Sequence, residues 1–265
     1  MHQSKKIGQL STRGDKFSLY TTTYGDHFDT QVLFFHNLGE YHDRYKEFAK
    51  YLYSNKIGSI FIDMRGHGLS SGTRGHASSC QEILEDYEIF FESNSDLLEK
   101  KDVFMCGHGL GALLCMSLDN YYNRLSGMIL VNPLVQYSES TDVGFHKYFG
   151  GKSIFEKLKI TIPTSSISQQ HDPLVNRKMT LGMQRSINEL IKRVKYSSYF
   201  INIPVLYVIG QEDGIVDLPL SELFSSSIDT SLMMLKKYPE LGHELFNEQH
   251  REKVFNDICN WLALT

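Results

Sequence analysis

The chain has 265 residues and a formal net charge of −4; 41% of its residues are hydrophobic and 22% are charged, as in ordinary globular proteins. This acidic balance excludes the basic surface that would attract nucleic acid or an anionic membrane. We expect no membrane span, because no apolar run is long enough, and no signal peptide, because no apolar segment follows the charged N-terminal residues.

The cysteines are scattered along the chain without a C-x-x-C pair, at Cys80, Cys106, Cys115 and Cys259. This spacing predicts free thiols and a cytoplasmic location. No pattern in the sequence indicates a metal or another cofactor.

The first half of the chain alternates strand-like and helix-like segments. A hairpin is predicted over residues 6–24. Buried strands are predicted over residues 31–35 and 58–63, from residue 103, and over residues 127–131. Helices are predicted over residues 41–55 and 79–98, and from the turn near residue 109 to about residue 121. Strands that alternate with helices indicate βαβ units and a parallel sheet with helices on both faces.

This alternation is interrupted over residues 136–197, where no clear strand is visible and a helix is predicted from about residue 176 to 194. It resumes with segments at 203–209, 218–225, 231–238 and 247–262. The pattern predicts a core of residues 1–135 and 198–265, with residues 136–197 inserted as a helical lid over the carboxyl edge of the sheet.

A glycine-rich turn joins the apolar strand that begins at Val103 to an apolar helix. Its spacing, Gly107-His108-Gly109-Leu110-Gly111, is that of the nucleophile elbow G-x-S-x-G, in which the middle residue stands on a sharp turn at the top of a parallel sheet. That middle residue is Gly109, where a serine is expected. The turn should form, but it has no oxygen to attack an ester.

Four further stretches accompany this turn. They are H-N-L-G-E-Y-H-D-R-Y at 36–45, D-M-R-G-H-G-L-S-S-G at 63–72, I-G-Q-E-D at 209–213, and the loop from Tyr238 to Glu244. In this order they resemble the α/β-hydrolases, and within them the monoacylglycerol lipase and lysophospholipase group. The resemblance implies an α/β-hydrolase fold, with a mostly parallel eight-strand sheet, helices on both faces and a helical lid. The chain departs from the group's pattern at Gly109, in place of serine, and at Asn37, in place of a glycine, which we expect to tilt its loop.

The resemblance also implies the roles of the site residues. Position 109 corresponds to the nucleophile, Asp213 to the acid and His243 to the general base, in the chain order of this fold. Among the 11 histidines, His243 alone follows the last strand and precedes the last helix. The backbone N–H groups of Leu38 and Leu110 correspond to the oxyanion hole.

Other polar residues in these motifs have structural interpretations. Asp217 is the alternative acid, although its expected role is to cap the next helix. His36 and His108 are expected to support or pack against the site. The remaining candidates are expected to form a turn network: Asp63, Arg65, His67 and Ser70.

The implied activity is hydrolysis of a carboxylic ester, in an acylglycerol or a lysophospholipid, by a serine hydrolase mechanism. As written, the chain should be nearly inactive. Three explanations of Gly109 stay open: an engineered replacement, a natural pseudoenzyme, or slow hydrolysis by a water that His243 drives. The apolar side chains expected to bind an acyl chain, or else to pack the lid, are Tyr137, Phe145, Tyr148, Phe149, Leu174, Leu181 and Met183.

Two rival functions are weighed against this one. Gly107, Gly109 and Ala112 also fit the dinucleotide pattern G-x-G-x-x-A, but no acidic residue follows at 131–133, where that pattern needs one. The second rival is a non-catalytic protein that binds a lipid or ester. The expected partner is therefore a small-molecule ester or lipid, with transient membrane contact through the lid and no nucleic acid.

Overall fold

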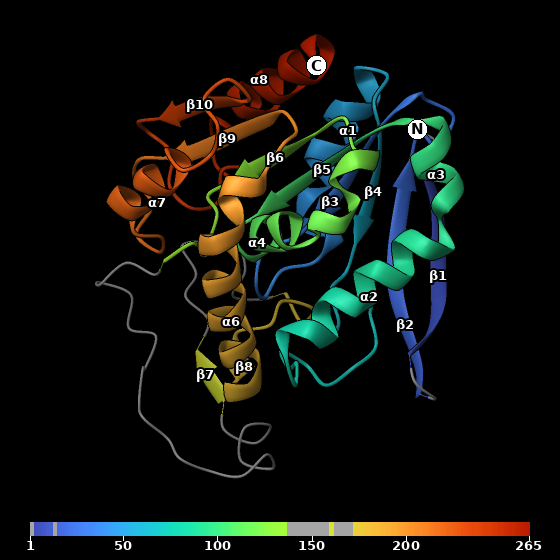
Figure 1. The fold of residues 1–265 in the computed structure, drawn as a ribbon. Coiled ribbons are helices and arrows are strands. Elements are labelled where there is room, and N and C mark those ends of the chain that lie inside the picture. The colour runs from blue at the N-terminus through green and yellow to red at the C-terminus, as the bar shows by residue number, and fades with distance from the viewer. Residues whose placement is uncertain (1–2, 13–14, 137–158, 162–171) are drawn as a thin grey trace.

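The computed structural model describes residues 3–12, 15–136, 159–161 and 172–265. A sheet of eight strands runs through the molecule in the order β1-β2-β4-β3-β5-β6-β9-β10 (Figure 1). The strands are β1 (Gln3–Thr12), β2 (Asp15–Tyr24), β3 (Thr30–Phe35), β4 (Gly58–Ile62), β5 (Asp102–His108), β6 (Gly127–Val131), β9 (Val205–Gly210) and β10 (Met233–Tyr238).

Within this sheet, β4, β3, β5, β6, β9 and β10 are paired in parallel, whereas the β1–β2 hairpin and its junction with β4 are antiparallel. The carboxyl ends of β3, β5, β6, β9 and β10 therefore lie at one edge of the sheet. In an open α/β sheet this edge holds the ligand site. The predicted eight-strand, mostly parallel sheet is confirmed.

Helices cover both faces of the sheet, as Figure 1 shows. They are α1 (Lys46–Ser54), α2 (Cys80–Ser93), α3 (Ser95–Lys100), α4 (Leu110–Ser117), α6 (Leu181–Ser197), α7 (Leu218–Ser225) and α8 (Arg251–Leu264). Strand β5 shows why two layers form: alternate side chains point to opposite faces. Met105 packs in the cluster beneath α2, α4 and α6, and Phe104 packs in the cluster beneath α1 and α8.

Three predicted helices in the first half of the chain differ from the observed ones. The helix expected over 79–98 breaks at Asn94, whose side chain donates to the Phe90 carbonyl (2.7 Å), and continues as α3. The helix expected over 41–55 starts with a 3-10 turn, His42–Tyr45, before α1. The helix after the glycine turn ends at Ser117 and gives way to a 3-10 helix, Asp119–Arg124.

The prediction that residues 136–197 contain no strand is wrong. Strands β7 (Lys159–Thr161) and β8 (Lys178–Thr180) pair antiparallel. Each has three residues, too few to show the alternation that identifies a strand. Helix α6 then starts five residues later than expected, where the Thr180 hydroxyl accepts from the Met183 N–H (3.2 Å) and caps it.

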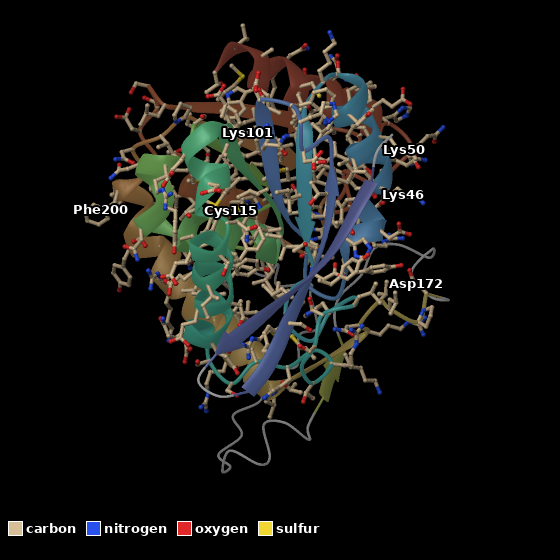
Figure 2. All side chains as sticks on the ribbon, turned by 90° about the vertical axis from the view of Figure 1, so that its right-hand side faces the viewer. Lys46, Lys50, Lys101, Cys115, Asp172 and Phe200 are labelled. Atoms are coloured by element: carbon tan, nitrogen blue, oxygen red, sulfur yellow. The ribbon has the colours of Figure 1, made fainter. Side chains whose placement is uncertain are left out.

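Helix α6 packs against α2 and α4 on one face of the sheet (Figure 1). Its inner side is apolar and buried, whereas Phe200, just beyond its end, projects outward and is 74% exposed (Figure 2). The lid boundaries at 136 and 197 stay a prediction, since much of this insertion lies outside the described residues. Among the residues described, no helix is both long and apolar enough to cross a membrane.

Candidate active site

The turn after β5 has the backbone of an elbow. Gly109 has φ 54° and ψ −110°, a left-handed conformation that glycine adopts without a Cβ penalty, and α4 begins at the next residue. The turn is also tightly packed: a Cβ on Gly111 would lie 2.0 Å from the Phe35 carbonyl oxygen. Close packing of α4 against β3 thus accounts for the glycine at position 111.

Asp213 and His243 meet at the carboxyl edge of the sheet. Asp213 follows β9 and His243 follows β10, and the His243 Nδ1 lies 2.7 Å from the Asp213 Oδ2. The other carboxylate oxygen accepts from the N–H groups of Ile215 (2.7 Å) and Val216 (3.0 Å). Asp213 therefore stabilises its own turn while it also holds the histidine.

The charge balance of this pair favours an ionised acid. Burial raises the pKa of Asp213, but the charge and hydrogen bond of His243 and the two backbone N–H groups outweigh it, so that the pKa is lowered. Burial lowers the pKa of His243, but Asp213 outweighs it and the net pKa is raised. Because the ionised acid can only accept, it takes the Nδ1–H of a neutral His243, and Nε2 is left with its lone pair.

Asn37 occupies the centre of the site. Its Oδ1 accepts from the backbone N–H groups of Leu38 (2.8 Å) and Leu110 (3.2 Å), and its Nδ2 lies 3.0 Å from the His243 Nε2. A Cβ added to Gly109 would lie 2.0 Å from the same Oδ1. From the sequence we expect Asn37 to tilt its loop. In the structure its side chain fills the space between the two predicted oxyanion donors and the histidine.

A buried polar network supports this arrangement from below. His108 Nε2–H donates to the His243 carbonyl (2.8 Å), and its Nδ1 lies 2.9 Å from the Tyr45 hydroxyl. The Tyr45 hydroxyl donates to the buried Glu40 carboxylate and accepts from the Asn37 N–H (3.1 Å). His108 thus supports the site as predicted. Glu40 and Tyr45 also support it; both lie in the 36–45 motif, but the sequence indicated no such role for them.

The 63–72 stretch forms the predicted turn network. Asp63 accepts from the N–H groups of His42 (2.7 Å) and Leu69 (2.9 Å), and the Ser70 hydroxyl donates to the Asp63 carbonyl (2.5 Å). Arg65 pairs with Asp86 at 2.6 Å.

Asp217 and His36 have the structural roles expected of them. The Asp217 carboxylate accepts from the Leu220 N–H (2.9 Å) and caps α7. The His36 Nε2 accepts from the Met64 N–H (2.8 Å). Neither side chain is hydrogen-bonded to Asp213 or His243.

The predicted acyl-binding residues are only partly described. Four of them lie outside the described residues: Tyr137, Phe145, Tyr148 and Phe149. Met183 is fully buried in the core beneath α4, which favours the packing alternative for it, and Leu174 and Leu181 are half-buried. Within the described ranges no group of three histidine, cysteine or acidic side chains is placed to hold a metal.

This sheet topology, with a sharp strand-to-helix turn at its centre, defines the class of the protein: it is an α/β-hydrolase. The model of one family in that class, described as serine aminopeptidase, S33, matches residues 26–250. The chain belongs to this family.

Relatives and a solved structure agree with this membership. The chain is 24% identical over 250 residues to a monoacylglycerol lipase of Mycolicibacterium smegmatis, covering 88% of this chain and 87% of that protein. It is 24% identical over 240 residues to phospholipase YtpA of Bacillus subtilis, with coverage of 84% and 91%. The fold matches a soluble variant of monoglyceride lipase from Saccharomyces cerevisiae, solved with a substrate analog, with TM-score 0.80, 21% identity and coverage of 97% and 94%. The chain is thus of the monoacylglycerol lipase or esterase type of hydrolase.

Proposed function

We propose that this protein derives from a carboxylic ester hydrolase acting on monoacylglycerols or lysophospholipids, and that the chain as written has little or no turnover. His243 is the base and Asp213 its orienting acid, the Leu38 and Leu110 N–H groups are the oxyanion donors, and position 109 is the vacant nucleophile. The observation that carries the proposal is the 2.7 Å contact between His243 and Asp213 beside an elbow that lacks a serine.

Acyl transfer needs a nucleophile, a base and donors for the developing oxyanion. In this chain the lone pair on His243 Nε2 faces the elbow and accepts from Asn37 instead of from a hydroxyl. Two buried thiols of the elbow strand and helix, Cys106 and Cys115, are no substitute, because burial raises the pKa of each well above its ordinary value and keeps it protonated.

The substrate class is supported by the relatives. One is named a monoacylglycerol lipase and another a phospholipase, and both align over most of this chain. Small acyl-glycerol esters and lysophospholipids share a single acyl chain on a polar head group. Peptides and lactones remain as comparison substrates, because one fold hosts many chemistries.

Hydrolysis of a monoacylglycerol, a lysophospholipid, a short p-nitrophenyl ester and a peptide amide tests this proposal. The chain as written is compared with Gly109→Ser, with and without Asn37→Gly. The best serine variant should gain about three or more decades in kcat on the lipid esters, and His243→Ala in that variant should abolish the gain. Folded serine variants that hydrolyse no ester would contradict the proposal.

A second candidate, a non-catalytic protein that binds a lipid or ester, is favoured by the absence of a nucleophile at position 109. Such a protein would bind a monoacylglycerol without turnover, and the His243→Ala variant would bind it equally well. Binding of a fluorescent monoacylglycerol by both proteins, with no release of fatty acid by either, distinguishes this role from residual catalysis.

A further inference from the structure

The Asn37 side chain has one self-consistent orientation. The N–H groups of Leu38 and Leu110 can only donate, so the side-chain oxygen must face them, at 2.8 and 3.2 Å. The amide nitrogen then faces His243, whose Nδ1–H is taken by Asp213. Nε2 is thereby free to accept from Nδ2. All three contacts are satisfied together only with neutral His243 and with Asn37 in this orientation.

The contacts of this carboxamide are those that an acyl substrate and a nucleophile would make between them. In the proposed mechanism the ester carbonyl oxygen accepts from the Leu38 and Leu110 N–H groups, and a hydroxyl donates to His243 Nε2. The Asn37 Oδ1 takes the place of the ester carbonyl oxygen, and its Nδ2 takes the place of the donating hydroxyl. The same oxygen lies 2.0 Å from the position that a Cβ at residue 109 would take, so the side chain also fills part of the nucleophile's space.

We propose that Asn37 is a built-in occupant of the oxyanion hole, and that Asn37 and Gly109 act as a coupled pair that closes the site to ester carbonyls. This inference rests on the proposed function, because it takes the Leu38 and Leu110 N–H groups as the oxyanion donors. It goes further, because it assigns the closure of the site to two residues. A serine at 109 alone does not restore the site, whereas removal of Asn37 alone opens the oxyanion hole.

The coupling follows from the geometry. A side chain at 109 and the Asn37 carboxamide compete for the same space, so a serine there can take its place only at the cost of the hydrogen bonds that Oδ1 accepts. Conversely, Asn37 fits in the hole because residue 109 has no Cβ. A water that occupied the vacated space and was driven by His243 would have to displace the same carboxamide, since Nδ2 already satisfies Nε2.

A comparison of four proteins tests the coupling, in which the two without a serine at 109 set the background rate. It compares the chain as written with Asn37→Gly, Gly109→Ser and the double variant, by kcat/KM on a monoacylglycerol and by the rate of labelling with a fluorophosphonate. The double variant should exceed Gly109→Ser at least tenfold in both. Asn37→Ala with Gly109→Ser should act like the double variant, which guards against a loop loosened by glycine. Equal rates for Gly109→Ser and the double variant would overturn the proposal and leave the proposed function standing.

Binding of decanoate gives a readout that needs no catalysis. A carboxylate can accept from the two N–H groups once Asn37 is gone, so Asn37→Gly and Asn37→Ala should bind decanoate at least tenfold more tightly than the chain as written, by calorimetry. The matched control is Asn55→Gly, at the exposed end of α1, which should bind as the unaltered chain does. Equal affinity in all four proteins, or no binding in any, would overturn the inference. This result does not depend on whether the serine variants are active, so it is distinct from a failure of the proposed function.

Discussion

Three carboxylates raise the pKa of the His243 ring against the effect of its burial, and a second histidine ring packs beside it. Asp213 is bonded to Nδ1, the charges of Glu40 and Glu244 also favour the imidazolium, and the His108 ring lies 5.0 Å away between centroids. Of these, only Asp213 touches the ring with a carboxylate. The contact at 2.7 Å should therefore be the main reason that the pKa of His243 is raised despite burial.

Asp213→Asn should lower the pKa of His243, because the amide keeps an acceptor but removes the charge that stabilises the imidazolium. We expect this fall to be seen in an NMR titration of the histidine ring. Asp217→Asn is the matched control: it removes a carboxylate only four positions away, but one that caps α7 and does not contact His243. Equal titration curves for the two variants would show that the Asp213 charge does not govern His243.

At this scale the sequence predicted which residues meet but not what lies between them. Asp213 and His243 could be predicted because each follows a recognisable strand, and parallel strands end at one edge of the sheet. The position of Asn37 could not, because it depends on where the side chain turns at the end of β3. That direction depends on the absent Cβ at Gly109, which is 72 positions further along the chain.

The position of helix α4 is closely determined by the backbone of β3. Gly111 in its first turn faces the β3 backbone, and an added Cβ would meet the Phe35 carbonyl oxygen at 2.0 Å and its carbon at 2.6 Å. These are main-chain atoms, which cannot rotate away as a side chain can. Any side chain at 111 must shift α4 itself, and with it the Leu110 N–H.

Gly111→Ala should therefore lower the free energy of unfolding by about 1–3 kcal/mol or more, the usual cost of overpacking a core. Gly214→Ala is the control, because no heavy atom lies within 4 Å of its added Cβ, and its effect should stay within about 0.5 kcal/mol. Urea denaturation of both variants measures the difference. Equal midpoints would mean that α4 can move away from β3 at little cost.

Elements of the sheet were predicted better than those of the insertion. Core strands such as β5 and β9 are continuous apolar runs, buried on both faces, and such runs are plain in a sequence. Strand β8 has three residues and pairs only with β7, so neither length nor alternation revealed it. The break between α2 and α3 was missed because Asn94 interrupts a helical pattern that resumes at the next residue.

At the scale of the whole molecule, buried carboxylates link the fold to pH. The pKa of Asp213 and of Asp63 is lowered, because the hydrogen bonds and charges of histidines outweigh burial. Burial also raises the pKa of Glu40, but the charge of His108, 3.7 Å away, with the charge of Arg44 and the hydrogen bond of Tyr45, brings it down to about 2. Asp86 acts in the opposite sense, since burial leaves its pKa raised.

The sign of the pH effect follows from the direction of each shift. An acid with a lowered pKa in the folded state stabilises the fold above its unfolded pKa, which is 3.8 for the aspartates and 4.5 for Glu40, and loses that contribution as the pH falls. His243, with a raised pKa, contributes below 6.5 and loses its contribution as the pH rises through the folded value. Burial lowers the pKa of His36 and of His67, the latter to about 3, so these two histidines act against His243 and destabilise the fold as the pH falls below 6.5. Together with the acids of lowered pKa, they should make stability fall as the pH drops from about 6.5.

We expect the urea midpoint to fall as the pH is lowered from about 6.5 toward 2. The acid limb should become shallower in Glu40→Gln, because that side chain cannot take up a proton when the protein unfolds, whereas Asp29→Asn, at an exposed carboxylate just before β3, should leave its slope nearly unchanged. Measuring all three proteins between pH 2.5 and 8 tests the assignment. A midpoint that stays flat from about pH 5 to 3 would show that the network beneath His243 does not carry the buried charge inferred for it, because a charged Glu40 must lose its stabilising contribution in that range.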